Sequence, residues 1–555
     1  MTVVRILHRL RAVGSLAVLV IAFACADDGP AGPDPEPGDG PPSDVVPDQV
    51  LARLAPGVEV AEVNGRYGTS TISAVETQRV YLLGLPEGSQ VEQILPAMRA
   101  DPDVTSASAN GVLAVPEAQG RSTMAFADPS LQRPDREDQA AVGRIRASQA
   151  WGRSRGQGIV VAVLDTGVDA GHPQLAGHIE PGGVDLVDAD ADPSDTPDGI
   201  DNDGDDLVDE AVGHGTFVAG LILAAAPDAR ILPIRILDSD GVGSADAIAS
   251  GIEIAVDRGA RIVNLSLGME IESEVLEEVI EEQAREKGIV FVASAGNRDS
   301  DQPQYPAGQN EVMAVAATTP GDSKADFSNW GSWVSLSAPG VGLVSVLPAA
   351  GMGRWSGTSF SSALVSGEAA VLIGFAPFAR SDEVRGAMEG SAVELADFRL
   401  NGAGRIDIAA ALDLLDDHLG GGGAEEIEFD AGVASIDPFA RILRLEDGMV
   451  LAVPHDGVVD RSGDYRTLAG AAAAVSAGVS VRAEGEAIQD GGGLRAIEVR
   501  LEDADGSEDD DDDSSGPGGG DDDPDDSSGP GGGEDDPDES SGPGGDDSDD
   551  ETDDG

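Results

Sequence analysis

The central part of the sequence predicts an α/β fold, in which a parallel sheet carries helices on both faces. From Gly158 onward, short apolar runs rich in β-branched residues alternate with longer runs of helical spacing. This alternation is typical of parallel sheets, because a helical crossover usually joins one strand to the next. The runs cover residues 159–164, 214–226, 231–237, 245–257, 262–267, 274–287, 289–293, 312–317 and 359–375.

Length, charge and cysteine content restrict the classes of protein that fit. The chain has 555 residues, too many for one hydrophobic core, so we expect several domains. Its formal net charge of −69 argues against nucleic acid as a partner. The single cysteine, Cys25, excludes a disulfide within the chain.

Residues 1–24 have the pattern of a secretory signal peptide. Basic residues precede an apolar run that is short for a membrane span, and Ala22-Phe23-Ala24 matches an A-x-A cleavage pattern. Cys25 follows at once, which resembles bacterial lipoprotein signals and implies a lipidated, membrane-anchored N-terminus. The alternative is plain secretion with an incidental cysteine. Residues 25–45 are rich in Pro, Gly and Asp and predict a disordered tether.

Residues 46–115 predict a separate small α+β domain. Apolar runs at 50–54, 79–85 and 104–115 indicate strands, and residues 91–99 have one apolar face at helical spacing. A polar processing linker, residues 116–141, follows this domain.

The expected α/β domain, residues 142–418, contains four polar motifs whose order along the chain bears on function. Asp165 ends an apolar strand, and His214 and Ser359 each open an apolar helix. Asn297 follows another strand. In open parallel sheets the site lies at the carboxyl ends of the strands, so these side chains can converge. The order Asp, His, Ser is one of the three known chain orders of the serine hydrolase triad.

These motifs resemble those of the subtilisin-like serine proteases, the subtilases, over roughly residues 142–415. The resemblance implies a subtilisin-like catalytic domain that cleaves peptide bonds through an acyl-enzyme. It implies that Ser359 is the nucleophile, that His214 is the general base and that Asp165 orients the imidazole. Asn297 would donate to the oxyanion, together with the backbone N–H of Ser359.

The same resemblance implies how substrate binds. An extended peptide would add as a strand between two backbone segments of this chain. The implied substrate-binding residues are Gly241, Val242, Gly243, Ser266, Leu267, Gly268, Ser294, Ala295 and Gly296. The 46–115 unit resembles the subtilase propeptide, which implies a zymogen that is inhibited by its own N-terminal domain. An unrelated small α/β domain is the alternative for this unit.

The sequence also departs from the family pattern. Phe217 replaces a second histidine, and Ala363-Leu364 replaces Pro-His after the serine, but none of these positions does chemistry. Asp169 matches a ligand of a calcium site of the family. The loop that supplies its partners is missing, so we expect that site to be absent.

An acidic insertion at residues 198–210 predicts a different metal site. Carboxylates at alternate positions of a glycine-bearing loop can face one hard cation, although the EF-hand pattern is not met. Similar insertions occur in other subtilases. The predicted structural Ca²⁺ ligands are Asp201, Asp203, Asp205 and Asp209. The alternative is a solvated acidic loop.

The C-terminal part predicts a small β domain and an acidic tail. Short strands in residues 425–502 indicate a small β-barrel, similar to an OB-fold, without a catalytic constellation. Residues 503–555 repeat Ser-Ser-Gly-Pro-Gly-Gly with a period of thirteen, at Ser514, Ser527 and Ser540. Such a polar, acidic segment cannot form a core and is expected to be disordered.

The sequence thus indicates a secreted serine endopeptidase made as a self-processing zymogen, which needs no cofactor for catalysis. Its expected partners are polypeptide substrates and its own propeptide. One alternative is a catalytically silent binding protein that is displayed at the cell surface and built on a subtilase scaffold. The other is an esterase, against which the absence of G-x-S-x-G around Ser359 argues.

Overall fold

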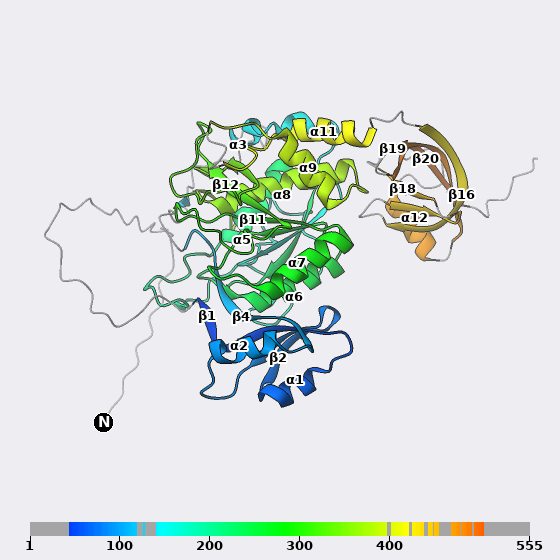
Figure 1. The fold of residues 1–555 in the computed structure, drawn as a ribbon. Helices are drawn as coiled ribbons and strands as arrows, with labels where there is room; N and C mark the ends of the chain where they lie inside the picture. The colour runs from blue at the N-terminus through cyan, green and yellow to red at the C-terminus, as the bar shows by residue number, and fades with distance from the viewer. Residues whose placement is uncertain are drawn as a thin grey trace, which may run out of the picture. The chain divides into compact units, whose positions relative to one another are not determined.

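The structure of the chain is a computed structural model. It describes residues 44–118, 126–127, 140–396, 401–420, 425–437, 442–447, 449–453, 468–477, 479–490 and 493–503. The predicted signal peptide, Cys25, most of the tether and the acidic tail lie outside these residues. Figure 1 shows the described elements with their labels.

The N-terminal unit, residues 45–115, is a twisted antiparallel sheet with helices. Its strands are β1 (Val45–Leu54), β2 (Ser70–Val75), β3 (Val80–Gly84) and β4 (Val104–Ala114). Its helices are α1 (Val60–Tyr67), α2 (Val91–Arg99) and the short 3₁₀ turn η1 (Glu76–Gln78). The strand order is β2-β3-β1-β4-β9, so the sheet continues into a strand of the next domain, β9 (Val242–Ser244).

The central domain confirms the predicted α/β fold. Its seven-stranded sheet has the order β13-β12-β11-β10-β6-β8-β7, and neighbouring strands are parallel. The strands are β6 (Val160–Asp165), β7 (Val184–Asp185), β8 (Arg230–Arg235), β10 (Ile262–Leu265), β11 (Val290–Ser294), β12 (Val312–Thr318) and β13 (Leu336–Pro339). The five central strands, β6, β8, β10, β11 and β12, are buried almost throughout, as sheets covered on both faces require.

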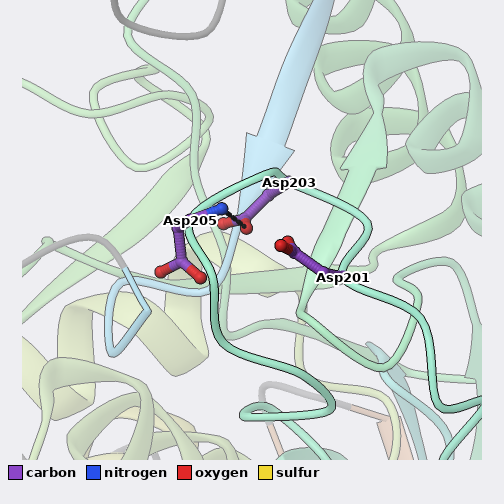
Figure 2. Close-up of side chains that lie close together, drawn as sticks. All are labelled: Asp201, Asp203 and Asp205. Carbon is purple, nitrogen blue, oxygen red and sulfur yellow. Dashed lines mark hydrogen bonds between the residues drawn. The ribbon is translucent and has the colours of Figure 1, made fainter.

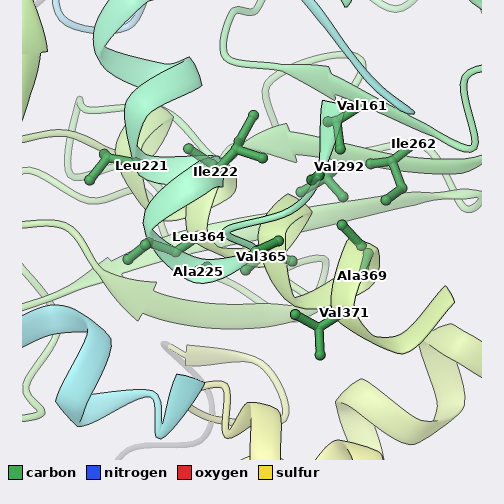
Figure 3. Packing of buried hydrophobic residues seen from close by; sticks show 14 of the residues in the cluster. Val161, Leu221, Ile222, Ala225, Ile262, Val292, Leu364, Val365, Ala369 and Val371 are labelled. Carbon is green, nitrogen blue, oxygen red and sulfur yellow. The ribbon is translucent and has the colours of Figure 1, made fainter. Parts of the chain in front are cut away.

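Helices cover both faces of this sheet. One face packs against α5 (His214–Ala225), α8 (Thr358–Phe375), α9 (Ser381–Ser391) and α11 (Ile408–Gly420). The other packs against α6 (Ala245–Asp257) and α7 (Glu274–Lys287). Figure 3 shows part of the first core, where side chains of α5 and α8 lie near Val161, Ile262 and Val292. The short helices α3 (Ala140–Arg144) and α4 (Ala147–Ala150) precede the sheet.

A small antiparallel sheet was not predicted. It consists of β14 (Leu343–Leu347), β15 (Gly351–Trp355) and the two-residue β5 (Phe126–Ala127). The β14–β15 hairpin leads directly into α8, so it sets where that helix begins.

The C-terminal strands close into a barrel with the order β16-β17-β18-β20-β19. They are β16 (Glu425–Asp437), β17 (Ile442–Leu445), β18 (Val450–Ala452), β19 (Val481–Asp490) and β20 (Gly493–Asp503). The helix α12 (Leu468–Ser476) was missed, because only strands were expected there. Its sequence is rich in alanine, which has the highest helix propensity of any residue type.

One buried carboxyl in the core predicts a pH-dependent stability. Glu368 lies in α8, is fully buried, and neither of its oxygens has a hydrogen-bond partner. Burial raises the pKa of Glu368 well above its usual value, and the charge of Asp407 adds to the shift. When the pH exceeds the usual pKa of a glutamate, Glu368 loses its proton in the unfolded chain but keeps it in the folded chain. The free energy of unfolding therefore falls as the pH rises toward the pKa of Glu368 in the folded chain.

We therefore expect Glu368→Gln, which cannot ionise, to raise the free energy of unfolding by about 1–3 kcal/mol at pH 8. Urea unfolding between pH 5 and 9, in a chain that also carries Ser359→Ala to prevent self-digestion, measures this. Glu286→Gln is the matched control, since Glu286 lies exposed on α7. An unchanged pH slope in the Glu368 variant would contradict the prediction.

Candidate active site

The four predicted catalytic residues lie at the same edge of the parallel sheet. Asp165 is the last residue of β6, and Asn297 follows the end of β11 by three positions. His214 is the first residue of α5, and Ser359 is the second residue of α8. Helix N-termini and strand carboxyl ends meet at this edge, which is why residues so distant in sequence can share a site.

Two glycines allow the elements that carry the site to approach closely. A Cβ at Gly215 would lie 2.2 Å from the carbonyl oxygen of Gly167, just beyond the end of β6. A Cβ at Gly367 would lie 2.5 Å from the Cβ of Ala225, where α8 crosses α5. Any larger residue at either position would push the elements of Asp165, His214 and Ser359 apart.

His214 lies between two carboxylates. Its Nδ1 is 2.7 Å from Asp165 Oδ1, and its Nε2 is 3.1 Å from Oε2 of Glu117. Burial alone would lower the pKa of His214, but the two carboxylates outweigh it and raise the pKa to about 10. In this state the imidazole holds both protons at neutral pH.

Ser359 is bonded to the same Glu117 oxygen. Its Oγ donates to Glu117 Oε2 at 2.7 Å and lies 3.3 Å from the carbonyl oxygen of Ser266. Ser359 Oγ and His214 Nε2 are therefore held by the same carboxylate oxygen. Both side chains are fully buried there.

Asn297 is fixed so that its amide nitrogen faces the site. Its Oδ1 accepts from the backbone N–H and the hydroxyl of Thr358, at 3.0 and 2.9 Å. This leaves Nδ2 to donate to Glu117 Oε1, at 3.0 Å. An amide held in this way is a pre-organised donor for a developing oxyanion.

Asp195 holds the helix that carries His214, and sequence reasoning missed it. Its carboxylate accepts from the N–H groups of Gly213 and Thr216, at 2.9 and 3.2 Å, and from the Thr216 hydroxyl at 2.7 Å. These bonds satisfy donors at the start of α5 that lack partners within the helix. Burial raises the pKa of Asp195 to about 6. No signal in the sequence pointed to it, because it lies in an irregular segment.

Aromatic rings enclose the other sides of His214. The ring centroids of Trp355 and Phe360 lie 5.6 and 5.5 Å from that of the imidazole. Phe217 contacts both rings, edge-to-face with Trp355 and tilted against Phe360. Phe217, the noted departure from the family pattern, is thus a core residue. This packing limits the orientations that the imidazole can adopt.

The chain itself lies across the predicted substrate-binding residues. Strand β4 pairs antiparallel with β9, with Leu113 opposite Gly243 and Ala114 opposite Val242. On its other side, Ala114 exchanges both backbone hydrogen bonds with Gly268. Gly241–Ser244 and Gly268, which we call the peptide-binding edges because substrate is predicted to bind there, therefore already hold an extended segment. Val115 adds a bond from its N–H to the Gly241 carbonyl.

The remaining predicted substrate residues surround the same place. Ser266 contacts Ser359 and Ser362 through its hydroxyl, and Leu267 accepts from the Ser294 hydroxyl. The N–H of Gly296 donates to Thr358 Oγ1 at 3.1 Å. Ala295 is fully buried between strands.

The structure brings three of the four predicted calcium ligands together. Carboxylate oxygens of Asp201, Asp203 and Asp205 lie within 4.8 Å of one another. Figure 2 shows these three side chains in their loop. Asp209 is not in this group, because its carboxylate accepts from the N–H groups of Asp198 and Gly199. The spacing of residues in the loop could not reveal that difference.

Two further carboxyls lie close to this group. Asp240 is fully buried and accepts from the N–H groups of Asn202 and Asp209. Both oxygens of Glu210 are buried without a hydrogen-bond partner, and burial, with the charges of Asp240, Asp205 and Asp203, raises its pKa to about 7. The loop thus concentrates negative charge near the start of α5.

Among the described residues, one helix is long and apolar enough to cross a membrane by length and composition. It is α8, of which 94% of the apolar window is buried inside the fold and which carries Ser359. It is a core helix of the central domain.

The chain is similar to known proteins over its central domain. A model of the Subtilase family matches residues 156–405. Thermitase from Thermoactinomyces vulgaris is 38% identical over 239 residues, which cover 41% of this chain and 80% of thermitase. Subtilisin BL from Lederbergia lenta is 34% identical over 280 residues, covering 49% of this chain and 97% of that protein.

A solved structure shows the same fold. It is fervidolysin from Fervidobacterium pennivorans, described as a keratinolytic enzyme related to subtilisin. The TM-score is 0.57 at 24% sequence identity, and the match covers 73% of this chain and 66% of fervidolysin.

Proposed function

The chain belongs to the subtilase family and is a peptide hydrolase of the serine protease type, and we propose that Asp165, His214 and Ser359 are its catalytic triad. The observation that best supports this assignment is the convergence of Ser359 Oγ, His214 Nε2 and Asn297 Nδ2 on one carboxylate. These are the groups that acyl transfer needs as nucleophile, base and oxyanion donor. Asp165 supports the base from the other side, at 2.7 Å.

The residues would act in a defined sequence once Glu117 has left the site. Ser359 Oγ attacks the peptide carbonyl carbon while His214 Nε2 takes its proton, and Asn297 donates to the resulting oxyanion. His214 then passes the proton to the leaving amine, which departs with the C-terminal part of the substrate. Water repeats the attack on the acyl-enzyme and releases the N-terminal part.

Polypeptide substrates would bind as an added strand on the peptide-binding edges. The support is the antiparallel pairing that the chain's own residues 112–115 make with Gly241–Ser244 and Gly268. Backbone bonds of this kind hold many sequences, and the side-chain pockets beside them set the preference.

We further propose that residues 45–115 are an inhibitory propeptide. They contact the catalytic domain through more than the substrate segment. Arg53 pairs with Glu278 and Glu282 of α7, and Asn110 exchanges two hydrogen bonds with Asp246 at the start of α6. Removal of this unit would be needed before substrates reach Ser359.

Secretion and lipidation of Cys25 remain part of the proposal. They rest on the basic start, the apolar run and the A-x-A-Cys sequence of the N-terminus. Fatty-acid labelling of the wild-type chain and of Cys25→Ser tests the lipid anchor, which a label retained in the variant would exclude.

The experiment that tests the protease proposal follows the full chain after folding. We expect its mass to fall by the loss of the N-terminal unit, and hydrolysis of unfolded casein to begin at the same time. A chain that is folded but keeps its mass and leaves casein intact, even after added protease has removed residues 1–115, would contradict the proposal. That result would favour a silent binding scaffold.

We propose that the loop at residues 201–205 binds a structural Ca²⁺. Carboxylate oxygens of Asp201, Asp203 and Asp205 suit a hard cation, and the unpartnered oxygens of Glu210 and the buried Asp240 lie close by. Burial and the neighbouring acids Asp205, Asp240 and Asp201 raise the pKa of Asp203, a repulsion that a cation would relieve. The ion would brace the loop that leads into His214.

We expect a chelator to lower the melting temperature of the Ser359→Ala chain by about 5–10 °C, because a ligand of the folded state stabilises it by mass action. Asp203→Asn should abolish this response to calcium. Asp206→Asn is the matched control, since Asp206 is exposed in the same loop and outside the carboxylate group. Equal melting temperatures with calcium and with chelator would exclude the site.

A further inference from the structure

We propose that the side chain of Glu117 is an intramolecular ligand of the catalytic centre that keeps the uncleaved chain inactive. The inference rests on the proposed catalytic roles of Ser359, His214 and Asn297. It goes further than a propeptide that only covers the site, because it assigns the inhibition to one carboxylate and one turn.

The chain leaves the substrate path directly before it would reach Ser359. Residues 112–115 follow the peptide-binding edges as an extended strand, up to the bond from Val115 N–H to the Gly241 carbonyl. The N–H of Ala118 then bonds to the carbonyl of Val115 and closes a turn. We call Val115–Ala118 the Glu117 turn. Pro116 suits its second position, because its ring fixes φ and it has no N–H to satisfy.

The turn places the carboxylate of Glu117 in the site, where a bound substrate would have its peptide bond. Oε2 of Glu117 is bonded to Ser359 Oγ and His214 Nε2, and Oε1 accepts from Asn297 Nδ2 at 3.0 Å. The Glu117 side chain is only 2% exposed. A Cβ at Gly357 would lie 1.7 Å from Glu117 Oε1, so the space for the carboxylate exists only because residue 357 is glycine.

Each bond of Glu117 occupies a group that catalysis needs. The carboxylate occupies the Asn297 donor that would face the oxyanion of a substrate. It also accepts the hydrogen bond that the Ser359 hydroxyl donates. With Asp165 it also raises the pKa of His214 to about 10, so the imidazole carries the proton that it would have to accept. Charge-assisted bonds of this kind are stronger than neutral ones, and here they are shielded from water.

Glu117 is also poorly suited to be a substrate in this position. A carboxylate has no leaving group that Ser359 could displace, and its negative charge opposes attack by a nucleophile. The contact is therefore inhibitory for as long as the turn stays in place. Activation requires the turn to withdraw. A brief withdrawal in a few molecules would allow the first self-cleavage, and release of the N-terminal unit would then keep the site open.

A reagent that reports directly on the Ser359 hydroxyl tests this inference. The full chains of wild type, Glu117→Gln and Glu117→Ala are folded and sampled over time with a fluorophosphonate, which bonds covalently to an activated serine. Labelling is read separately on the full-mass band and on the shortened band. Glu87→Ala is the matched control, since Glu87 is an exposed glutamate of the same N-terminal unit.

We expect the wild type and Glu87→Ala to be labelled only after their mass has fallen. Both Glu117 variants should be labelled at full mass, at least about tenfold faster than the wild-type full-mass band. If the full-mass Glu117 variants stay as unreactive as wild type while their shortened forms react, the inference is wrong and the protease proposal stands. If no form reacts at any mass, both fail together.

A second measurement does not depend on the folding of the variants. A synthetic peptide of residues 108–118 is added to the processed wild-type protein and inhibition of casein hydrolysis is measured. The peptide with Glu117→Gln should inhibit at least about tenfold more weakly. Equal inhibition by the two peptides would show that the backbone pairing, and not the carboxylate, carries the inhibition.

Discussion

Ser359→Ala is expected to lower kcat for casein or peptide hydrolysis by about 10⁶-fold, with little change in KM. Only the nucleophile can form the acyl-enzyme, and in subtilisin its loss costs about this much. The fully buried Ser359 hydroxyl donates at 2.7 Å to Glu117, so the substitution removes a bond to the turn but no packing volume beyond one oxygen. The variant chain should also keep its full mass, because self-cleavage needs the same hydroxyl.

The matched control for this variant is Ser361→Ala on the same helix. Ser361 is equally buried, but its hydroxyl bonds to the backbone carbonyls of Ala338 and Pro339 and not to the catalytic groups. The free energy of unfolding of Ser361→Ala should fall by about 1 kcal/mol, and its activity should stay within a fewfold of the wild-type value. If the two serine variants lose activity to a similar extent, Ser359 is not the nucleophile.

Asp165→Ala is expected to lower kcat by about 10⁴-fold. The carboxylate accepts the Nδ1 proton of His214 at 2.7 Å, which leaves Nε2 free to act as the base, and its charge stabilises the imidazolium that forms in the reaction. In subtilisin the loss of the aspartate costs less than the loss of the serine, because the imidazole can still act in part. Initial rates measured with a chromogenic peptide, on chains processed by an added protease, give the value.

Two comparisons make the Asp165 result specific. Asp326→Ala removes an exposed aspartate of the same domain and should leave kcat unchanged. The double variant Asp165→Ala with Ser359→Ala should be no less active than Ser359→Ala alone, because triad members act as one unit. A fall of less than about tenfold for Asp165→Ala in a folded chain would remove Asp165 from the triad.

The sequence alone predicted the α/β fold and the meeting of four polar residues at one edge of the sheet, for reasons that are local. The spacing of apolar residues in each run indicates which side of the segment is buried. That spacing distinguishes a strand from a helix. Asp165 ends β6, Asn297 follows β11, and His214 and Ser359 lie at the starts of helices. The topology of a parallel sheet therefore placed all four at one edge. The roles of the four residues came from the family resemblance.

The tertiary structure decided which other groups reach that edge. Glu117 bonds to Ser359 across 242 positions of the chain, and Asp195 caps α5 from an irregular segment 18 and 21 positions before the residues it bonds. Asp209 faces backbone N–H groups instead of Asp201, Asp203 and Asp205. In each case the partner is set by the path of a turn or loop, which has no apolar periodicity to reveal it. Side-chain contacts between irregular segments depend on packing of the whole domain, and only the folded structure determines them.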